Sequence, residues 1–271
     1  MALAPPLTDT SDDAIVRAIV EHDTFLVTTL VRLAGIELHE EPDASWYVSG
    51  VDDPLFNGVL RTSMAAADAE RRIDELLGRF REAGVPALWW ATPQSTPADL
   101  PSRLAARGIE RTSMPGLALD LARLPDAPVP EGLRIEQVAD AAGIDAYLTA
   151  GGDAFDIPVA HRERFRGTPE AVMAGDIPGW CLVGWVDDAP VATAVICVAT
   201  GVAGLSNIAT VPAHRRRGIG AAVTAHGLRL ARDRGYRTAV CTSTASGAPL
   251  YEALGFVERC RVDDFEFRPS S

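Results

Sequence analysis

The sequence predicts an α/β (α+β) protein made of two halves that follow each other along the chain. Three observations support this prediction. Strand-like and helical stretches alternate over almost all of the 271 residues, and 47% of the residues are hydrophobic. Both halves also end in the same order of helix, strand, short helix and strand. A chain of this length can bury the cores of two ordinary domains, so an internal duplication is expected.

The first half is expected to contain three helices and four strands. Apolar residues recur every three or four positions in the helical stretches, and Gly35 and Gly84 end the first two of them. Pro97 is expected in the first turn of the third helix. The predicted helices lie at 12–35, 68–84 and 96–108, and the predicted strands at 45–51, 57–63, 85–92 and 117–124.

The second half has the longer run of strands. Residues 139–175 are expected to form two helical segments that break around Gly151-Gly152 and Pro158. Asp187-Asp188 is expected to be a turn, and the last residues a pair of strands that turns at Asp263-Asp264. The remaining strands are predicted at 132–138, 180–186, 189–200, 204–211 and 237–244, and the remaining helices at 218–234 and 247–255.

The stretch "LPDAPVPEG" separates the two halves. It carries three prolines, two acidic residues and a glycine between two predicted strands, which is typical of a linker. The sequence therefore predicts an N-terminal domain at 1–125, a linker at 126–132 and a C-terminal domain at 133–271.

Composition excludes several classes of function. The net charge is −12 and the chain contains no lysine, so all 25 basic side chains are arginine. A lysine Schiff base and a phosphate loop ending in Gly-Lys are therefore excluded, and a nucleic-acid partner is disfavoured. The four cysteines show no metal-ligand spacing, so no metal is expected. The first residues do not resemble a signal peptide, and no apolar run could span a bilayer, which predicts a cytoplasmic protein with no membrane partner.

Positive charge is concentrated in one stretch, "TVPAHRRRGIGAAV". Residues 211–237 contain seven arginines and a single acidic residue, Asp233. A strand that turns through glycines into a helix exposes backbone N–H groups at the positive end of the helix dipole. Arginine side chains add charge-assisted, bidentate contacts to phosphate. The stretch therefore predicts a binding site for a phosphate-bearing ligand.

This loop is not a dinucleotide fingerprint. That motif requires glycine or alanine where Val223 stands, and an acidic residue at the end of the following strand. The spacing here is instead Arg215-x-x-Gly218-x-Gly220, after a predicted strand that ends at Val211. A second motif follows about 30 residues later, in "GAPLYEALGF".

Together the two motifs identify a resemblance to the GNAT superfamily of acyl-CoA-dependent N-acyltransferases. The resemblance covers roughly residues 131–268, and the N-terminal half resembles a degenerate copy without the cofactor loop. It implies two GNAT-like domains, each with a central mixed, mostly antiparallel twisted sheet flanked by helices. It also implies that the loop holds the diphosphate of coenzyme A and that the preceding strand separates from its neighbour to admit the pantetheine arm. The residues assigned to the cofactor are Ile208, Ala209, Thr210, Val211, Arg215, Arg216, Arg217, Gly218, Ile219, Gly220, Ala221 and Thr244.

The resemblance also assigns catalytic residues. Tyr251 would protonate the leaving thiolate, although a core tyrosine is a serious alternative because its neighbours are apolar. Many relatives carry a carboxylate on the strand before the loop, where this chain has Ser206-Asn207. Neither side chain accepts a proton unaided at neutral pH, so a water chain or a base from elsewhere is needed. The candidates are Asp153, Asp156, His161 and Glu163.

The expected reaction is direct transfer of an acetyl group from acetyl-CoA to a primary amine, without a covalent enzyme intermediate and without a metal. The backbone of the strand before the loop would stabilise the oxyanion. An acidic chain would attract a cationic amine. The alternatives are an acyl-CoA-binding sensor without turnover and, less favoured, a nucleic-acid-binding protein. A homodimer is left open as the assembly.

Overall fold

The computed structural model describes residues 4–269, which fold into two compact units. The first unit contains the described residues up to Leu30 together with Leu117–Arg259. The second contains Val31–Gly116 together with the described residues from Cys260 onward. This division differs from the expected single linker at 126–132, because each unit includes a segment from the opposite end of the chain.

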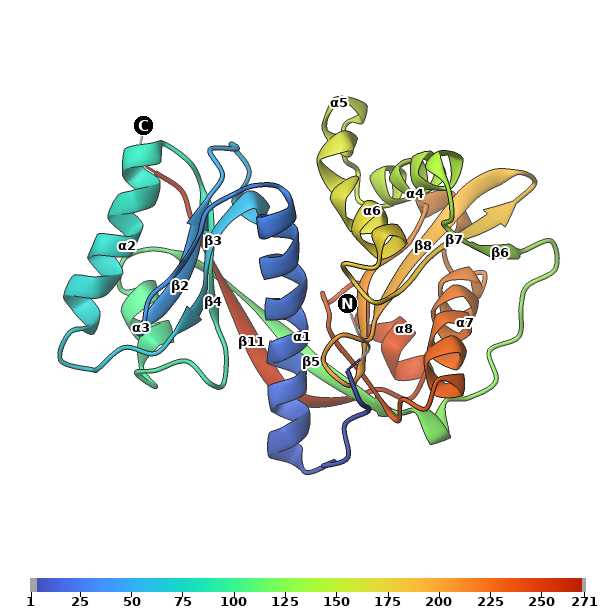
Figure 1. Ribbon diagram of the computed structural model, residues 1–271, viewed down its shortest axis with the longest axis horizontal. Helices are drawn as coiled ribbons and strands as arrows, with labels where there is room; N and C mark the ends of the chain where they lie inside the picture. Colours follow the sequence, from blue (N-terminus) through green and yellow to red (C-terminus); the bar gives the residue numbers. More distant parts are fainter. Residues whose placement is uncertain (1–3, 270–271) are drawn as a thin grey trace. The chain divides into compact units, whose positions relative to one another are not determined.

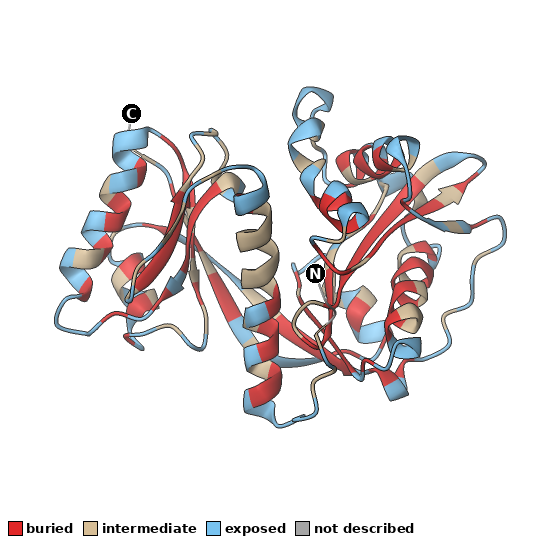
Figure 2. Cartoon of the chain, in the orientation of Figure 1, coloured by how far each residue is buried: buried red, intermediate tan, exposed pale blue. Residues whose placement is uncertain are grey.

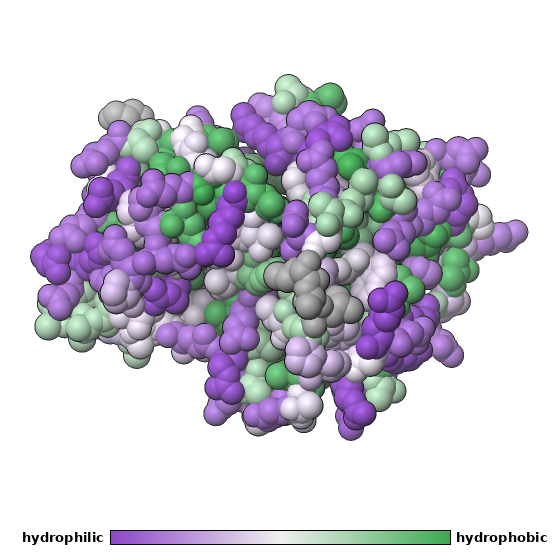
Figure 3. Space-filling model, in the orientation of Figure 1, coloured by the Kyte–Doolittle hydropathy of each residue, from purple (hydrophilic) through white to green (hydrophobic). Residues whose placement is uncertain are grey.

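The second unit contains strands in the order β1-β2-β3-β4-β11, followed by residues 110–116 of β5. Strands β3 and β4 are parallel, and the pairs β1-β2, β2-β3 and β4-β11 are antiparallel. On one side of these strands, α2 buries Ile73, Leu77 and Phe80 in a cluster with Trp89 and Phe265. The exposed side of α2 is hydrophilic (Figure 3). The elements are β1 (Leu38–Glu40), β2 (Ala44–Val48), β3 (Asn57–Thr62), β4 (Ala87–Ala91), the end of β11 (Val257–Phe267), α2 (Ala69–Ala83), α3 (Leu100–Ala105) and the short η1 (Pro54–Phe56).

The first unit contains strands in the order β10-β9-β8-β7-β6, with β9 and β10 parallel and the other neighbours antiparallel. Figure 1 labels three of them, β8, β7 and β6. Its strands are β6 (Arg134–Gln137), β7 (Gly179–Val186), β8 (Ala189–Cys197), β9 (Ala203–Thr210), β10 (Thr238–Thr242) and the end of β5 (Glu110–Asp120). Its helices are α1 (Asp12–Leu33, as far as Leu30), α4 (Ala141–Ala154), α5 (Val159–Arg162), α6 (Gly167–Ala174), α7 (Ile219–Asp233) and α8 (Ala248–Ala253), with the short η2 (Leu121–Arg123), η3 (Glu163–Phe165) and η4 (Pro212–His214).

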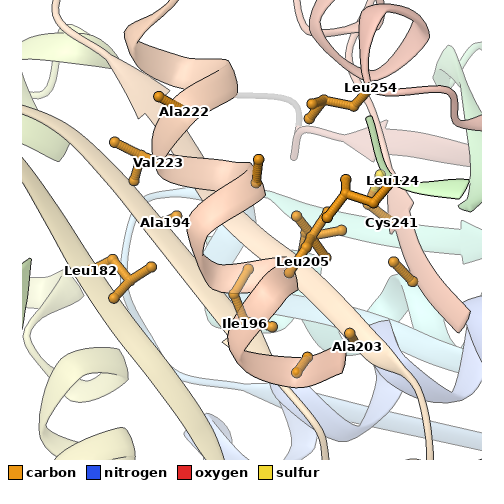
Figure 4. Close-up of a cluster of buried hydrophobic side chains, with 14 of the residues drawn as sticks. Leu124, Leu182, Ala194, Ile196, Ala203, Leu205, Ala222, Val223, Cys241 and Leu254 are labelled. Carbon is orange, nitrogen blue, oxygen red and sulfur yellow. The ribbon is translucent and has the colours of Figure 1, made fainter. Parts of the chain in front are cut away.

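Both faces of β7 and β8 are covered, which explains why these two strands are mostly buried and hydrophobic (Figure 2). Leu182 and Ile196 point to one face and pack in a cluster with Val223 of α7 (Figure 4). Cys181 and Val195 point to the other face and pack against α4, α6 and the apolar side of α1. Burial on two sides fixes the positions of the strand ends that form the site described below.

The N-terminal segment is attached to the first unit by several contacts. The backbone N–H of Leu7 donates to the carbonyl of Gly201 at 2.8 Å, and Arg259 forms an ion pair of 2.9 Å with Asp12. Further along α1, the side chain of His22 is completely buried. A side chain at Gly204 would overlap the His22 ring, so this glycine allows the close approach of α1 to β9.

Strands β9 and β10 pair at Ala203 and Gly204, opposite Ala239 and Val240. Beyond that point β9 continues to Thr210 and remains paired with β8. A register shift marks a bulge in β9, where Asn207 has a left-handed φ of 51°. The two parallel strands therefore pair at their beginnings only, as expected for strands that admit a ligand between them.

Three local predictions are wrong. The break at Gly151-Gly152 does not occur, because α4 continues to Ala154 and the missing side chain at Gly152 makes room for Arg162. The turn at Asp263-Asp264 does not occur either, since β11 continues through both residues in register with β4. Pro97 precedes α3 instead of lying in its first turn. The turn at Asp187-Asp188 is confirmed, with φ values of 49° and 59°.

Over residues 4–269, none of the helices is long and apolar enough to cross a membrane.

Candidate active site

A cavity of about 820 Å³ opens in the first unit, between the end of β9, the start of α7 and the start of α8. Eleven of the predicted cofactor and catalytic residues line it. They are Ile208, Ala209, Thr210, Arg215, Arg216, Gly218, Ile219, Gly220, Ala221, Thr244 and Tyr251. The cavity therefore brings together both sequence motifs, which are about 30 residues apart in the chain.

The N-terminus of α7 forms one wall of the cavity. Gly218 precedes the helix with a left-handed φ of 78°, and no side chain caps the helix. The N–H groups of the first turn are therefore available to a ligand, and the helix dipole adds positive potential there. Gly220 lies close to α8 and β9, since a Cβ atom there would be 3.0 Å from Leu250 and from Thr210. This wall fits an anionic group such as a diphosphate.

The three arginines of the loop have different surroundings. Arg215 donates from Nε to the carbonyl of Thr210 at 2.9 Å and from Nη2 to the carbonyl of Ala154 at 2.8 Å. Arg217 lies 3.2 Å from His214 Nδ1 and does not line the cavity. Arg216 is exposed at the cavity, with a left-handed φ of 58°. We therefore expect Arg216 to be the arginine with most freedom to meet a phosphate.

Tyr251 lines the cavity from α8 and is largely buried. Burial raises the pKa of its hydroxyl above the ordinary value, and the adjacent Cys241, which also hydrogen-bonds to it, raises that pKa further. The ring packs edge-on against Phe256, with centroids 5.4 Å apart. The phenol is thus fully protonated at neutral pH and held in place, as a proton donor requires. The apolar contacts do not separate it from the cavity.

Ser206, Asn207 and Val211 lie beside the cavity residues on β9 and directly after it, but they do not line the cavity. Asn207 is exposed at the bulge, and its carbonyl accepts a hydrogen bond of 2.8 Å from Thr193. Ser206 is half-buried, with its hydroxyl oxygen 3.3 Å from Nε2 of His22. The position at which relatives are expected to carry a carboxylate is therefore occupied by a serine paired with a histidine.

The four candidate bases lie between the end of α4 and η3, and two of them are engaged in ion pairs. Asp153 forms an ion pair of 2.7 Å with Arg162, and Glu163 one of 2.6 Å with Arg166. Asp156 is an exposed turn residue with a φ of 56°, and His161 is exposed on α5. None of the four lines the cavity.

Sequence reasoning missed two groups of residues at this site. Ala154, Phe155, Pro212, Ser246, Gly247, Pro249 and Leu250 also line the cavity. Pro212, Gly247, Pro249 and Leu250 lie inside the two quoted stretches, and Ser246 directly precedes the second, so the motifs themselves carried the signal for these residues. His22 is different, because it lies more than 180 residues from Ser206 and belongs to no motif.

The residues present fit an acyl carrier with a diphosphate, because bare amides, a free guanidinium group and a buried phenol meet in one cavity. Among the residues that the model describes, no group of three His, Cys, Asp or Glu side chains could hold a metal ion.

Comparison with known proteins agrees with this geometry. Residues 178–258 match the family model of the acetyltransferase (GNAT) domain. No curated protein sequence is similar enough to count as a match.

Several solved structures share the fold. A GCN5-related N-acetyltransferase from Kribbella flavida is 20% identical, with a TM-score of 0.70 over 93% of this chain and 96% of that one. Another from Sphaerobacter thermophilus is 18% identical, with a TM-score of 0.62 over 100% and 96%. A tandem GNAT protein from the clavulanic acid biosynthesis pathway is 15% identical, with a TM-score of 0.62 over 98% and 99%. Residues 178–258 therefore match the GNAT acetyltransferase domain, and the chain has the fold of the GCN5-related N-acetyltransferases, tandem ones included.

Proposed function

We propose that the protein is an N-acetyltransferase that transfers the acetyl group of acetyl-CoA to a primary amine on a small molecule or a protein. One observation carries the proposal: a single cavity is lined by the uncapped N-terminus of α7, by Arg216 and by the protonated Tyr251. An anion-binding helix end and a proton donor are the two features that acyl transfer from a phosphate-bearing thioester needs.

In this proposal the chain's residues divide the binding of acetyl-CoA between them. The first turn of α7 and Arg216 hold the diphosphate, Ile208–Val211 offer backbone groups to the pantetheine amides, and Thr244 adds a hydroxyl. Arg215 supports the loop from behind. Bound acetyl-CoA supplies the activated thioester.

The chemistry is direct attack by the amine on the acyl carbon. The backbone N–H groups of β9 near the bulge stabilise the negative charge on the oxygen, and Tyr251 gives its proton to the departing sulfur. An acidic chain favours a cationic amine as acceptor. The reaction as proposed requires no metal, nucleic acid or membrane, and we keep the cytoplasm as its proposed location.

One observation favours a second candidate, an acyl-CoA-binding sensor without turnover. The strand before the loop carries Ser206-Asn207, and neither side chain is a base on its own. Such a protein would bind acetyl-CoA with the same cavity and leave it unchanged.

Turnover measurements distinguish the acetyltransferase from the acyl-CoA-binding sensor. Acetyl-CoA is offered with a panel of amines (an amino sugar, a polyamine, an amino acid and a peptide with a free amino terminus), and release of free thiol is followed for wild type and Tyr251→Phe. Acetylated product that depends on Tyr251 supports the transferase. Tight binding of acetyl-CoA by calorimetry, without product from any amine of the panel, favours the sensor.

A further inference from the structure

His22 is a buried side chain with a polar partner on the strand that precedes the cofactor loop. Its Nε2 lies 3.3 Å from the hydroxyl oxygen of Ser206, and the ring also forms a hydrogen bond with the backbone of Leu205. The side chain is fully buried, whereas Ser206 is half-buried, next to the bulge at Asn207. The serine therefore connects an inaccessible imidazole to the end of β9, where the cavity begins.

The fold is built to hold the ring in this place. Residues of α1 up to Leu30 belong to the same compact unit as β9, and the helix packs on the face of β7 and β8 that α4 and α6 also cover. Gly204 leaves the space that the ring occupies, because a side chain there would overlap Nδ1. An apolar side chain would fill this site at a lower free-energy cost than a histidine, whose polar ring is costly to bury. The presence of the imidazole therefore points to a role for it.

The ring is neutral at physiological pH. Burial lowers the pKa of His22 from 6.5 to about 4, and the hydrogen bond to Leu205 opposes this only in part. The elements packed around the ring carry other titratable side chains, among them Asp23 of α1, Tyr147 of α4, Cys181 of β7, Cys197 of β8 and Cys241 of β10. Burial raises the pKa of Tyr147 and of the three cysteines, so they carry no charge at neutral pH, and the charge of Asp23 acts on Cys241.

We propose that His22 is a positioning residue of the acetyl transfer, which orients the hydroxyl of Ser206 so that the pair removes the proton of the acceptor amine. The inference rests on the function proposed above and assigns the base that its sequence motifs lack. It also means that the N-terminal helix, which lies outside the matched domain, completes the chemistry of the first unit.

Two protons move in this relay, one from the amine to Ser206 and one from Ser206 to His22. As the amine nitrogen bonds to the acyl carbon it becomes positively charged and acidic. Its N–H bond breaks while the Ser206 oxygen gains that proton, and the original O–H proton of Ser206 passes to Nε2 of His22. The buried imidazolium is unstable, so it returns the proton through Ser206 to water after the product forms.

This direction of transfer requires the neutral ring to carry its hydrogen on Nδ1. Among the residues that the model describes, no hydrogen-bond partner meets Nδ1. A buried N–H without a partner is unfavourable, so the competent tautomer is a minor form. We therefore expect an effect on kcat of about 10- to 100-fold, at or below the lower end of the range for general bases.

The test uses the full chain with His22→Gln, Ser206→Ala and the double variant. His226→Gln, on a half-buried histidine of α7 outside the cavity, is the matched control. Transfer from acetyl-CoA to the best amine of the panel is measured from pH 6 to 10, with calorimetric affinity for acetyl-CoA. We expect each single variant and the double variant to lose kcat by the same factor at pH 7, with unchanged affinity. The loss should shrink towards pH 10, where hydroxide replaces the relay.

The outcomes are distinguishable. A loss that is the same at every pH, or no loss in a folded variant, overturns the relay and leaves the proposed acetyltransferase intact. If His22→Gln does not fold, Ser206→Ala gives the same pH test alone. Wild-type protein that binds acetyl-CoA without acetylating any amine overturns the proposed function, and the relay with it.

Discussion

Arg215 donates a hydrogen bond of 2.8 Å from Nη2 to the carbonyl oxygen of Ala154, at the C-terminal end of α4. A second bond of 2.9 Å joins its Nε to the carbonyl of Thr210. The first arginine of the loop thus links α4 to the end of β9, although both Arg215 and Arg216 line the cavity. We therefore expect these adjacent residues to act differently, Arg215 on the shape of the loop and Arg216 on the ligand.

Arg216→Ala should weaken acetyl-CoA binding about 10- to 100-fold, because charge-assisted hydrogen bonds contribute roughly 1.5–3 kcal/mol. Thermal stability should not change, since the side chain is exposed. Combined with Gly218→Asp, which places a negative charge and a strained residue at the left-handed position, binding should be abolished. Calorimetry measures the acetyl-CoA affinity of the two variants, and melting curves measure their thermal stability. Arg232→Ala, at the opposite end of α7, is the control, and equal affinities for Arg216→Ala and Arg232→Ala would contradict the assignment.

Arg215→Ala should instead lower the melting temperature, because two backbone carbonyls lose their charged donor. Any loss of acetyl-CoA affinity should then accompany a change in the loop, visible as faster amide exchange of residues 210–218. Unchanged stability would contradict the supporting role of Arg215.

Tyr251→Phe should lower kcat by about 100-fold or more while acetyl-CoA affinity stays within a factor of two, because only the proton donor is removed and the ring packing on Phe256 remains. Single-turnover acetyl transfer with the best amine of the panel measures this. Tyr236→Phe, at another buried tyrosine of the same unit, is the matched control. Equal rates for both variants would assign Tyr251 to the core alone.

Much of the fold, and most of the residues that line the cavity, could be predicted from the sequence. Helix periodicity and glycine stops place α1, α2 and α7 correctly, because these signals depend on local geometry. The proposed anion site is inferred from glycines and arginines within ten residues of each other. The errors arise where tertiary contacts override local signals: Gly152 packs against Arg162 inside a helix, and Asp263-Asp264 continue a strand.

The exchange of terminal segments could not be predicted. Nothing local in α1 shows that its His22 packs against Gly204 in the other half of the sequence, or that the residues from Cys260 onward belong with β4. Such pairings depend on long-range complementarity, which a single sequence does not display. For the same reason the contact between Ser206 and His22 could not be predicted.

Gly204→Ala should destabilise the first unit by about 1–3 kcal/mol, because the added methyl group overlaps the imidazole of His22. Urea denaturation checks this. His22→Ala should relieve the overlap, so the double variant should be more stable than the sum of the two single changes predicts. Strict additivity would contradict the close packing of α1 on β9.

The free energy of unfolding of the second unit should depend on pH through the carboxyl group of Asp264. Burial raises the pKa of its carboxyl from 3.8 to about 7, and the charge of Asp263 adds to the effect. Asp263 itself pairs with Arg111 at 2.9 Å, whereas Oδ1 of Asp264 is buried without a partner among the described residues. Between pH 4 and pH 7 the unfolded chain therefore releases a proton that the folded chain keeps.

The free energy of unfolding should consequently fall as pH rises from 4 to 7, by roughly 3–4 kcal/mol from this group, and level off above pH 7. Asp264→Asn keeps the shape but cannot ionise, so the variant should lose this slope and exceed wild type in stability at pH 8. Urea denaturation at several pH values measures the slope. Asp263→Asn should reduce the slope in part, because it removes the neighbouring charge that adds to the raised pKa of Asp264. Equal pH slopes for wild type and Asp264→Asn would show that Asp264 ionises normally in the folded protein.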